Sequence, residues 1–496
     1  MRRVLPFIRG RYALAFVAGL FIGAGQAPLQ LWPLALCGMA IVFVLWDRAG
    51  TSRQAAAVGW WTGFGTFLCA MSWLVEPFLV EPSRTAWMIP FALIGMTGGL
   101  ALFWSLSFYL SKRFSMGLMG LVVLWALAEL ARGYVFTGFP WALPGYVWLD
   151  TPVAQLAAFV GPYGLTALTF ALAALCAQAY VRRSAGFIAL PLVASAALFG
   201  LGAVRLAQPL PAATEHSLRI VQPNAPQHLK WDPAYIPLFF ERALDLSDPT
   251  GADLVIWPET SVAAPLYAAT PYLDQISARV GAATAVVGLP RVDQERAYNS
   301  AVIIGAGGAV DAVYDKRHLV PFGEYIPFPK LLSALGLQVF TAQAGYGFTA
   351  GTSEALFDFG ALGKALPLIC YEAIFPRDTR SAERPDWLLQ MTNDAWFGTL
   401  TGPQQSLAQA RFRAIELGLP MVRAANTGIS AITDARGEII ASIPLGEAGA
   451  VTANLPGALP ATLYARLGER AVMILLTIIA LGAWLLPLFH RNRKTV

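Results

Sequence analysis

The chain divides into long apolar stretches and one extended polar stretch. Seven apolar segments fill most of the first 205 residues, and an eighth lies close to the C-terminus. An α-helix needs roughly 20 residues, most of them apolar, to cross the hydrocarbon core of a bilayer, so each segment is a candidate membrane span. The pattern therefore predicts eight spans, at about 12–27, 29–46, 56–79, 86–110, 115–131, 153–180, 186–204 and 471–488.

The polar stretch runs from about Glu215 to Pro460 and has the patterns of a globular domain. Short apolar runs predict strands, and apolar residues on one helical face predict helices over about 234–247 and 405–417. Strands interleaved with helices indicate a layered α/β sandwich. The predicted strands are Leu218–Gln222, Leu254–Trp257, Ala285–Leu289, Ala301–Ile304, Leu366–Cys370, Trp387–Met391 and Ile429–Thr433.

Composition and charge indicate a membrane protein and orient it. Of the 496 residues, 56% are apolar and 13% charged, with a mean hydropathy of +0.55, which excludes an ordinary soluble protein. Basic residues gather in alternate connections, and the positive-inside rule assigns these to the cytoplasm. Because seven spans precede the polar domain, we expect that domain on the side of the membrane opposite to the cytoplasm. The basic groups are Arg2, Arg3, Arg9 and Arg11; Arg48 and Arg53; Lys112 and Arg113; Arg182 and Arg183; and the tail 490–494.

The N-terminus has a second interpretation, as a signal peptide. Arg2 and Arg3 precede an apolar run, and Ala24-Gly25-Gln26-Ala27 resembles a cleavage site. We favour a retained first helix, because another apolar run follows almost at once and the N-terminal arginines fit the charge pattern. The four cysteines show neither a paired framework nor the C-x-x-C spacing of a metal site. The sequence therefore predicts no disulfide, no metal and no cofactor.

Three residues of the polar domain have the chemistry of an acyl-transfer site. Cys370 is the one cysteine of four that lies outside the apolar segments. Glu259 ends an apolar run after Trp257-Pro258, and Lys316 precedes a stretch rich in proline and glycine. A carboxylate, an amine and a thiol can serve as base, oxyanion stabiliser and nucleophile. Taken singly, each has an ordinary alternative: a turn glutamate, a solvated lysine and a small buried thiol.

The order Glu259, Lys316, Cys370 resembles the nitrilase superfamily, and longer strings resemble one of its member families, the bacterial apolipoprotein N-acyltransferases. The eight-span layout is similar too, so the likeness covers essentially the whole chain. One departure follows Gly398, where the family usually has Gly-Pro, an aromatic residue and Gln-His, but this chain has Gly402-Pro403 and then Gln404-Gln405-Ser406. The matching strings are Thr137–Trp141, Gln222–Trp231, Tyr298–Ser300, Tyr314–Glu324, Cys370–Glu372, Asn393–Gly398 and Arg423–Gly428.

The resemblance implies a nitrilase-like αββα sandwich inserted into an eight-helix transmembrane bundle. It implies seven helices in residues 1–210, a catalytic domain in the periplasm over 211–462, and a last helix with a basic cytoplasmic tail over 463–496. By position, Glu259 is the general base, Lys316 holds the oxyanion and Cys370 is the nucleophile that carries a thioester. Residues that support this site are Asn299, Glu324, Tyr371 and Glu372, and aromatic residues at the lipid entrance are Trp231, Trp396 and Tyr371.

The activity implied by the resemblance is the last step of lipoprotein maturation. An acyl chain would pass from a phospholipid, by resemblance from the sn-1 position of phosphatidylethanolamine, to the amine of a diacylglyceryl-cysteine at the N-terminus of an apolipoprotein. The partners are then a phospholipid donor, an apolipoprotein acceptor and membrane lipid, and the sequence has no basic patch that would indicate nucleic acid.

The sequence also allows other functions and another catalytic mechanism. A membrane-tethered carbon–nitrogen hydrolase or a phospholipase could use the same three residues, although eight spans exceed what an anchor needs. A transporter with a soluble binding module predicts ionisable residues within the spans, and these are rare apart from Glu129 and Arg132. A Cys–His pair is a rival mechanism, for which His318 lies nearest to the motifs, but Lys316 beside it fits the family position.

Overall fold

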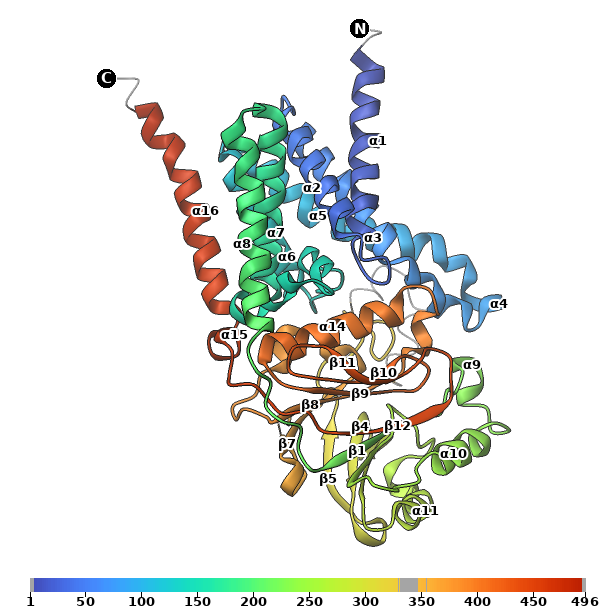
Figure 1. Cartoon of the computed structure of the whole chain (residues 1–496). Helices are drawn as coiled ribbons and strands as arrows, with labels where there is room; N and C mark the ends of the chain where they lie inside the picture. The colour runs from blue at the N-terminus through green and yellow to red at the C-terminus, as the bar shows by residue number, and fades with distance from the viewer. Residues whose placement is uncertain (1–3, 329, 331–346, 354, 493–496) are drawn as a thin grey trace.

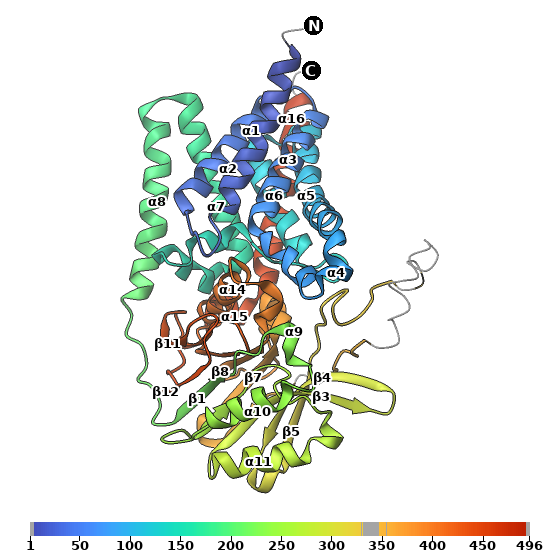
Figure 2. The ribbon, with the colours of Figure 1, turned by 90° about the vertical axis from the view of Figure 1, so that its right-hand side faces the viewer.

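The computed structural model describes residues 4–328, 330, 347–353 and 355–492. A helical region adjoins an α/β region, and α14 (Gly402–Leu417) lies between them (Figure 1 and Figure 2). The helical region contains α1 (Val4–Gly23), α2 (Trp32–Asp47), α3 (Ser52–Ala70), η1 (Ser72–Leu79), α4 (Pro82–Thr85), η2 (Ala86–Met88), α5 (Ile89–Arg113), α6 (Gly117–Arg132), η3 (Pro144–Trp148), η4 (Pro152–Leu156), α7 (Ala157–Arg182), α8 (Ala185–Leu206) and, after α15 (Leu463–Leu467), α16 (Glu469–Asn492).

A helix occupies each segment that was predicted to span the membrane. Among the described residues, three helical stretches are long and apolar enough to cross a bilayer: Pro82–Arg113, Pro152–Arg182 and Ala185–Leu206. α3 and η1 meet the same measure as a pair bent by 51°, and α1 and α2 supply shorter apolar helices. These helices fit a membrane protein, while the number of eight spans stays a prediction.

Two six-stranded sheets form the α/β region. Their strand orders are β12-β1-β2-β3-β4-β5 and β11-β10-β9-β8-β7-β6. In each sheet three neighbouring strands run parallel, β1-β2-β3 and β7-β8-β9, and the other pairs are antiparallel. The strands are β1 (Ser217–Gln222), β2 (Leu254–Ile256), β3 (Thr284–Asp293), β4 (Arg296–Ile304), β5 (Val310–Asp315), β6 (Phe357–Asp358), β7 (Lys364–Ile369), β8 (Trp387–Thr392), β9 (Met421–Ala425), β10 (Ser430–Thr433), β11 (Ile439–Ile443) and β12 (Gly449–Asn454).

Side chains alternate across each strand and so build the layers. Leu254 and Ile256 of β2 join the core between the two sheets, whereas Val255 packs under the outer helices. Two helices, α10 (Ile236–Asp245) and α11 (Thr270–Val280), cover the first sheet, and α14 covers the second. The order helix, sheet, sheet, helix confirms the predicted αββα sandwich.

The central helix α14 is buried on two faces. Ala410 and Ala414 pack on the second sheet, whereas Ala408, Phe412 and Ile415 belong to the core of the helical region. Because both faces are covered, α14 couples the position of the sandwich to the position of the helices above it (Figure 1).

The structure shortens two predicted strands at their ends, lengthens others, such as β3 to Asp293 and β4 from Arg296, and adds strands that the pattern missed. The strand predicted as Leu254–Trp257 ends at Ile256, and the one predicted as Leu366–Cys370 ends at Ile369. Cys370 has φ +53°, which an extended strand cannot contain. Of the missed strands, β5, β6, β11 and β12 are sheet edges with part-exposed positions that blur the apolar signal. The fifth, β9, is interrupted by a buried arginine, Arg423.

Candidate active site

Three strand ends bring the predicted site residues together. Glu259 follows β2, Lys316 follows β5 and Cys370 follows β7. The first two strands belong to one sheet and β7 to the other, so both sheets contribute to one site. Asn299 of β4 joins the same cluster, since its amide donates to Glu259 Oε1 at 2.7 Å. Glu259 and Lys316 are buried, with 8% and 1% of their surface exposed.

Cys370 is the first residue of η8 (Cys370–Ile374), at a sharp turn directly after β7. Its φ of +53° lies in the left-handed region, which is uncommon for a residue with a Cβ and is often found at functional sites. The Gln390 amide donates to the carbonyl of Cys370 at 3.2 Å, and the carboxylate of Glu372 accepts from the backbone N–H of Ile369 at 2.6 Å. These contacts hold the turn in its unusual conformation.

Glu372 also ties the Cys370 turn to the segment that carries Lys316. Its Oε1 accepts from the backbone N–H of Arg317 at 2.7 Å and from the hydroxyl of Tyr314 at 2.8 Å. Burial raises the pKa of Glu372, while its backbone donors act in the opposite direction. A buried carboxylate with this many donors is a fixed cross-link, so it sets the separation between the two strand ends.

Lys316 lies between two carboxylates. Its Nζ is 2.9 Å from Glu324 and 3.8 Å from Glu259. The amide nitrogen of Asn299 donates to both carboxylates, at 2.7 Å to Glu259 and 3.1 Å to Glu324. Glu324 therefore has the closer contact with the ammonium, and Glu259 is the less completely paired carboxylate.

Burial and neighbouring charges shift the protonation of these groups. Burial raises the pKa of Glu259; Lys316 acts against this shift and Glu324 adds to it. Burial alone would lower the pKa of Lys316, but Glu324 and Glu259 outweigh it and raise that pKa. Burial, then Glu259, raises the pKa of the Cys370 thiol to about 12, against the pull of Lys316. At neutral pH the thiol therefore keeps its proton until a nearby base removes it.

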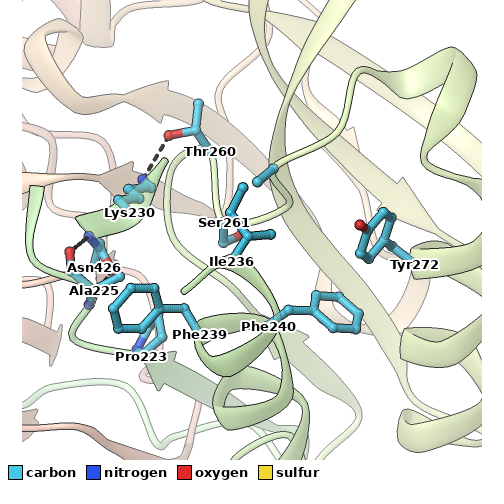
Figure 3. A pocket seen from close by; sticks show the side chains of 11 residues that line it. Pro223, Ala225, Lys230, Ile236, Phe239, Phe240, Thr260, Ser261, Tyr272 and Asn426 are labelled. Carbon is cyan, nitrogen blue, oxygen red and sulfur yellow. Dashed lines mark hydrogen bonds between the residues drawn. The ribbon is translucent and has the colours of Figure 1, made fainter. Parts of the chain in front are cut away.

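A second buried lysine, which the sequence analysis did not single out, borders this cluster. Lys230 is 6% exposed, and its ammonium donates to the carbonyl of Glu259 at 3.0 Å. It also donates to the hydroxyl of Thr260 at 2.8 Å (Figure 3). Burial lowers the pKa of Lys230 to about 8, against the opposite effects of Glu259 and Cys370. The lysine lies in the matching string 222–231, yet only the fold shows that it reaches the Glu259 loop.

The Glu259 loop is also held by its close fit to the neighbouring strand. Thr260 has φ +44°, so the loop turns sharply after Glu259. A Cβ at Gly288 of β3 would come within 2.4 Å of the Thr260 amide nitrogen, so a glycine is required for the loop to lie this close. A small hollow lined by Lys230 and by Phe239 and other apolar residues of α10 borders the loop on its other side (Figure 3).

The predicted aromatic residues fall into two groups. Trp231 and Trp396 are 48% and 40% exposed, so their rings are available to a ligand. Tyr371 is buried, belongs to a cluster with Trp73 and Trp141 of the helical region, and donates its hydroxyl to the carbonyl of Gly138 at 3.4 Å. Tyr371 therefore packs against the helical region, and the lipid entrance stays a prediction for the two tryptophans.

A buried ion pair on α6 holds the connection 137–141 against the site. Arg132 and Glu129 lie 2.5 Å apart and are fully buried. Arg132 Nη1 also donates to the carbonyls of Phe139 at 2.5 Å and Trp141 at 2.8 Å. These two ionisable residues of the apolar helices are thus paired and used to fix a loop.

His318 contacts the same connection from the catalytic side. Its Nε2 is 3.1 Å from the carbonyl of Thr137 and its Nδ1 is 2.6 Å from Asp378. The ring stacks on Phe375 with a centroid separation of 3.7 Å. Both ring nitrogens therefore have partners other than Cys370, as expected for a structural histidine.

The departure from the family pattern lies at the start of α14. Gln405 accepts from Trp141 Nε1 at 2.5 Å and donates to a backbone carbonyl between α1 and α2 at 3.0 Å. Ser406 accepts from Arg423 Nη2 at 3.0 Å, beside the buried ion pair of Arg423 with Asp394. Gln405 thus connects α14 to the helical region, and Ser406 contributes to a buried polar network.

An αββα sandwich with a glutamate, a lysine and a cysteine at its strand ends has the architecture of a carbon–nitrogen hydrolase, and residues 218–461 match the family described as carbon-nitrogen hydrolase. Residues 18–175 match the apolipoprotein N-acyltransferase N-terminal domain. The chain belongs to the apolipoprotein N-acyltransferase family. The resemblance found in the motifs is thereby confirmed.

Individual relatives align with this chain over nearly its full length. The chain is 38% identical to an apolipoprotein N-acyltransferase of Bradyrhizobium diazoefficiens, over 95% of this chain and 94% of the relative. It is 36% identical to an apolipoprotein N-acyltransferase of Rhodopseudomonas palustris, again over 95% and 94%. Among solved structures, a CN-hydrolase superfamily protein from Xanthomonas campestris aligns with a TM-score of 0.39 and 20% identity, covering 53% of this chain and 97% of that chain.

Proposed function

We propose that this protein transfers an acyl chain from a phospholipid to the N-terminal amine of a diacylglyceryl-cysteine on an apolipoprotein. The observation that carries the proposal is the meeting of Glu259, Lys316 and Cys370 at one end of the sandwich, in a chain that aligns over 95% of its length with enzymes of that name. The acyl chain passes through a thioester on Cys370. By family resemblance, the donor is phosphatidylethanolamine and the sn-1 chain moves.

The first half-reaction forms the thioester. The thiol proton of Cys370 passes to Glu259, and Sγ attacks the ester carbonyl of the donor. The electron pair of the carbonyl moves to its oxygen, which the ammonium of Lys316 stabilises. Collapse of this intermediate breaks the ester C–O bond. The departing oxygen takes the proton from Glu259, and a lysophospholipid leaves.

The second half-reaction forms the amide. The free amine of the acceptor attacks the thioester carbonyl, and Glu259 takes a proton from the attacking nitrogen. Breakage of the C–S bond returns the electron pair to sulfur, which regains the proton from Glu259. The raised pKa of Glu259 supports both directions of proton transfer, because it makes the carboxylate a stronger base than a solvent-exposed glutamate.

The membrane placement follows from the substrates. Moving a lipid chain into water costs about 0.8 kcal/mol per CH₂, so a site beside the bilayer avoids that cost for both donor and acceptor. We place seven spans in residues 1–210, the catalytic domain 211–462 in the periplasm, and the last span with its basic tail in 463–496. Trp231 and Trp396, both exposed, then line the entrance for the lipids.

A separation of the two half-reactions tests the proposal. Given phospholipid alone, the protein should release about one equivalent of lysophospholipid and then stall, as a covalent intermediate requires. A diacylglyceryl-cysteine peptide with a free N-terminus should discharge the enzyme, whereas its N-acetylated form should not. Continuous release of lysophospholipid and free fatty acid without any peptide would identify a lipid hydrolase and overturn the proposal.

A further inference from the structure

Two arginines from distant parts of the chain meet where α8 reaches the α/β region. Arg205 lies in the last turn of α8, and Arg436 lies in the turn between β10 and β11. Arg436 Nη1 donates to the carbonyl of Leu206 at 2.7 Å, so it binds the C-terminal end of α8. The two positive charges are close enough to repel each other.

Much of the hydrogen-bonding capacity of this arginine pair is unused. Arg205 is 8% exposed, and in the described part of the chain Nε and Nη2 of both arginines are buried without an acceptor. An unpaired charge is costly to bury, and a second like charge beside it increases that cost. Buried donors without partners in a native protein often indicate an absent ion or ligand. The unused donors and the two adjacent positive charges together favour a bound anion.

The nearby carboxylates do not supply that anion. Asp434 accepts from the backbone N–H groups of Arg436 at 2.8 Å and Glu438 at 2.9 Å. Asp150 pairs with a third arginine, Arg411, at 2.9 Å. Within the described residues, neither member of the arginine pair has an ion-pair contact with a carboxylate.

The surroundings of the pair identify the class of anion. α8 stands at the edge of the helical region (Figure 2), and Leu201 and Val204, next to Arg205, are 60% and 65% exposed. If α8 spans the bilayer as proposed above, its last turn lies at the depth of the lipid phosphates. Guanidinium groups bind phosphate through paired hydrogen bonds. Arg436 is part-exposed, which leaves a side from which a head group can approach.

We infer that Arg205 and Arg436 bind the phosphodiester of a phospholipid that is not the acyl donor. A lipid without an ammonium group, such as phosphatidylglycerol, is preferred, because the adjacent guanidinium groups repel a further positive charge. Arg205 belongs to the helical region and Arg436 to the catalytic domain, so the bound lipid joins the two. The inference rests on the proposed placement of α8 in the bilayer and not on the chemistry at Cys370.

Native mass spectrometry of the full-length protein tests this site. The protein is purified in detergent with equal amounts of phosphatidylglycerol and phosphatidylethanolamine, and the retained lipids are counted. We expect one retained phosphatidylglycerol in the parent, and about tenfold or greater loss of it in the double variant Arg205→Gln, Arg436→Gln, since each removed contact is charge-assisted. Arg470→Gln is the control, because Arg470 is an exposed arginine at the start of α16.

A lysine double variant and a competition with inorganic phosphate are two further tests of the site. The double variant Arg205→Lys, Arg436→Lys keeps both charges but loses the paired geometry, so it should retain the lipid less well than the parent even if the glutamine variant does not fold. Inorganic phosphate should not displace the retained lipid at millimolar concentration; displacement would identify free phosphate as the ligand. Equal retention of phosphatidylglycerol in the parent and in both double variants would overturn the inference. The stoichiometric release of lysophospholipid should persist in the variants, so their result is independent of the acyl-transfer proposal.

Discussion

The buried charges at the active site and those at the junction with the helical region differ in how they are matched. At the active site, Lys316 is 2.9 Å from one carboxylate and 3.8 Å from another, with the Cys370 thiol beside them. At the junction with the helical region, Arg413 of α14 pairs with Glu416 at 2.5 Å, and both are fully buried. Arg413 also donates to the hydroxyl of Tyr146 in η3 at 2.9 Å. The first cluster shares one ammonium among several acidic groups, and the second pairs one cation with one anion.

The difference shows that similar charged residues serve catalysis at the active site and stabilise the packing of α14 at the junction. A carboxylate with an incomplete partner can accept a proton, which suits Glu259 for the role of base. In a one-to-one pair each charge neutralises the other, and breaking a buried pair leaves an uncompensated charge. Arg413 and Glu416 therefore hold α14 in place between the sandwich and the helices, and changes there should affect stability before chemistry.

Replacement of the thiol should have the largest effect. Cys370→Ala should abolish acyl transfer, because neither the thioester nor any later step can form without the sulfur. Transfer of a labelled acyl chain to a diacylglyceryl-cysteine peptide measures this. Cys176→Ala, a change of a cysteine within α7, is the control and should retain activity. Measurable transfer by Cys370→Ala would remove Cys370 from the nucleophile's role.

Replacement of Lys316 should have the second-largest effect on activity. Lys316→Met should lower the rate of lysophospholipid release by about 10²–10³, the cost of removing one oxyanion contact. Lys364→Met is a matched control, since Lys364 is a part-exposed lysine paired with Glu383 at the surface. A Lys316→Met rate within a few fold of the parent rate would show that the cluster does not stabilise an oxyanion through this lysine.

Lys230 extends the comparison, because it adds a second ammonium, which binds the backbone carbonyl of Glu259. Lys230→Met should slow acyl transfer by about tenfold, the value of one hydrogen bond to a charged donor. Since the pKa of Lys230 is lowered to about 8, its charge is present below that pH and lost above it. The alkylation rate of Cys370 by iodoacetamide should therefore differ most between parent and variant below pH 8. A ratio that does not change with pH would leave Lys230 a structural role alone.

Glu416→Gln tests the structural cluster and should have the smallest effect on chemistry. Burial raises the pKa of Glu416 to about 7, against the opposing effect of Arg413. The folded protein then holds the proton more tightly than the unfolded chain, so this contribution to stability is full below about pH 4.5 and is lost as pH rises through 7. Glutamine is neutral throughout, so thermal unfolding at pH 5 and pH 8 should differ less in the variant. An unchanged difference in Tm would contradict the assignment.

Much of this site could be predicted from the sequence, because the motifs contain its residues. The three central residues also follow the ends of strands, where the backbone fixes the positions of their side chains. Cys370 stood out as the thiol outside the apolar segments, and Glu259 as the residue after a buried strand. Lys230 could not be found in this way, since its contact with the Glu259 carbonyl joins segments 29 residues apart. Arg205 and Arg436 are also far apart in the sequence, so their proximity is seen only in the folded structure.

The strands were predictable where they are buried and mostly apolar, and they were missed where they are part-exposed. Central strands such as β2 and β8 are buried along their whole length and mostly apolar, so the pattern revealed them. The edge strands β11 and β12 have part-exposed residues, and their pairing is decided by neighbouring strands. The bend of 51° between α3 and η1 also lies beyond a hydropathy pattern, which counts apolar residues but not the direction of the chain.

The central claim is that an acyl chain rests on Cys370 between two half-reactions, and intact-protein mass spectrometry tests it most directly. After incubation with a phospholipid of one defined acyl chain at sn-1, the protein should gain the mass of that acyl group less one hydrogen. Peptide mapping should locate the group on Cys370, and hydroxylamine should remove it as a thioester. Cys370→Ala should gain nothing. An acyl group found on another residue, or no added mass while lysophospholipid is released and the peptide is acylated, would contradict the account.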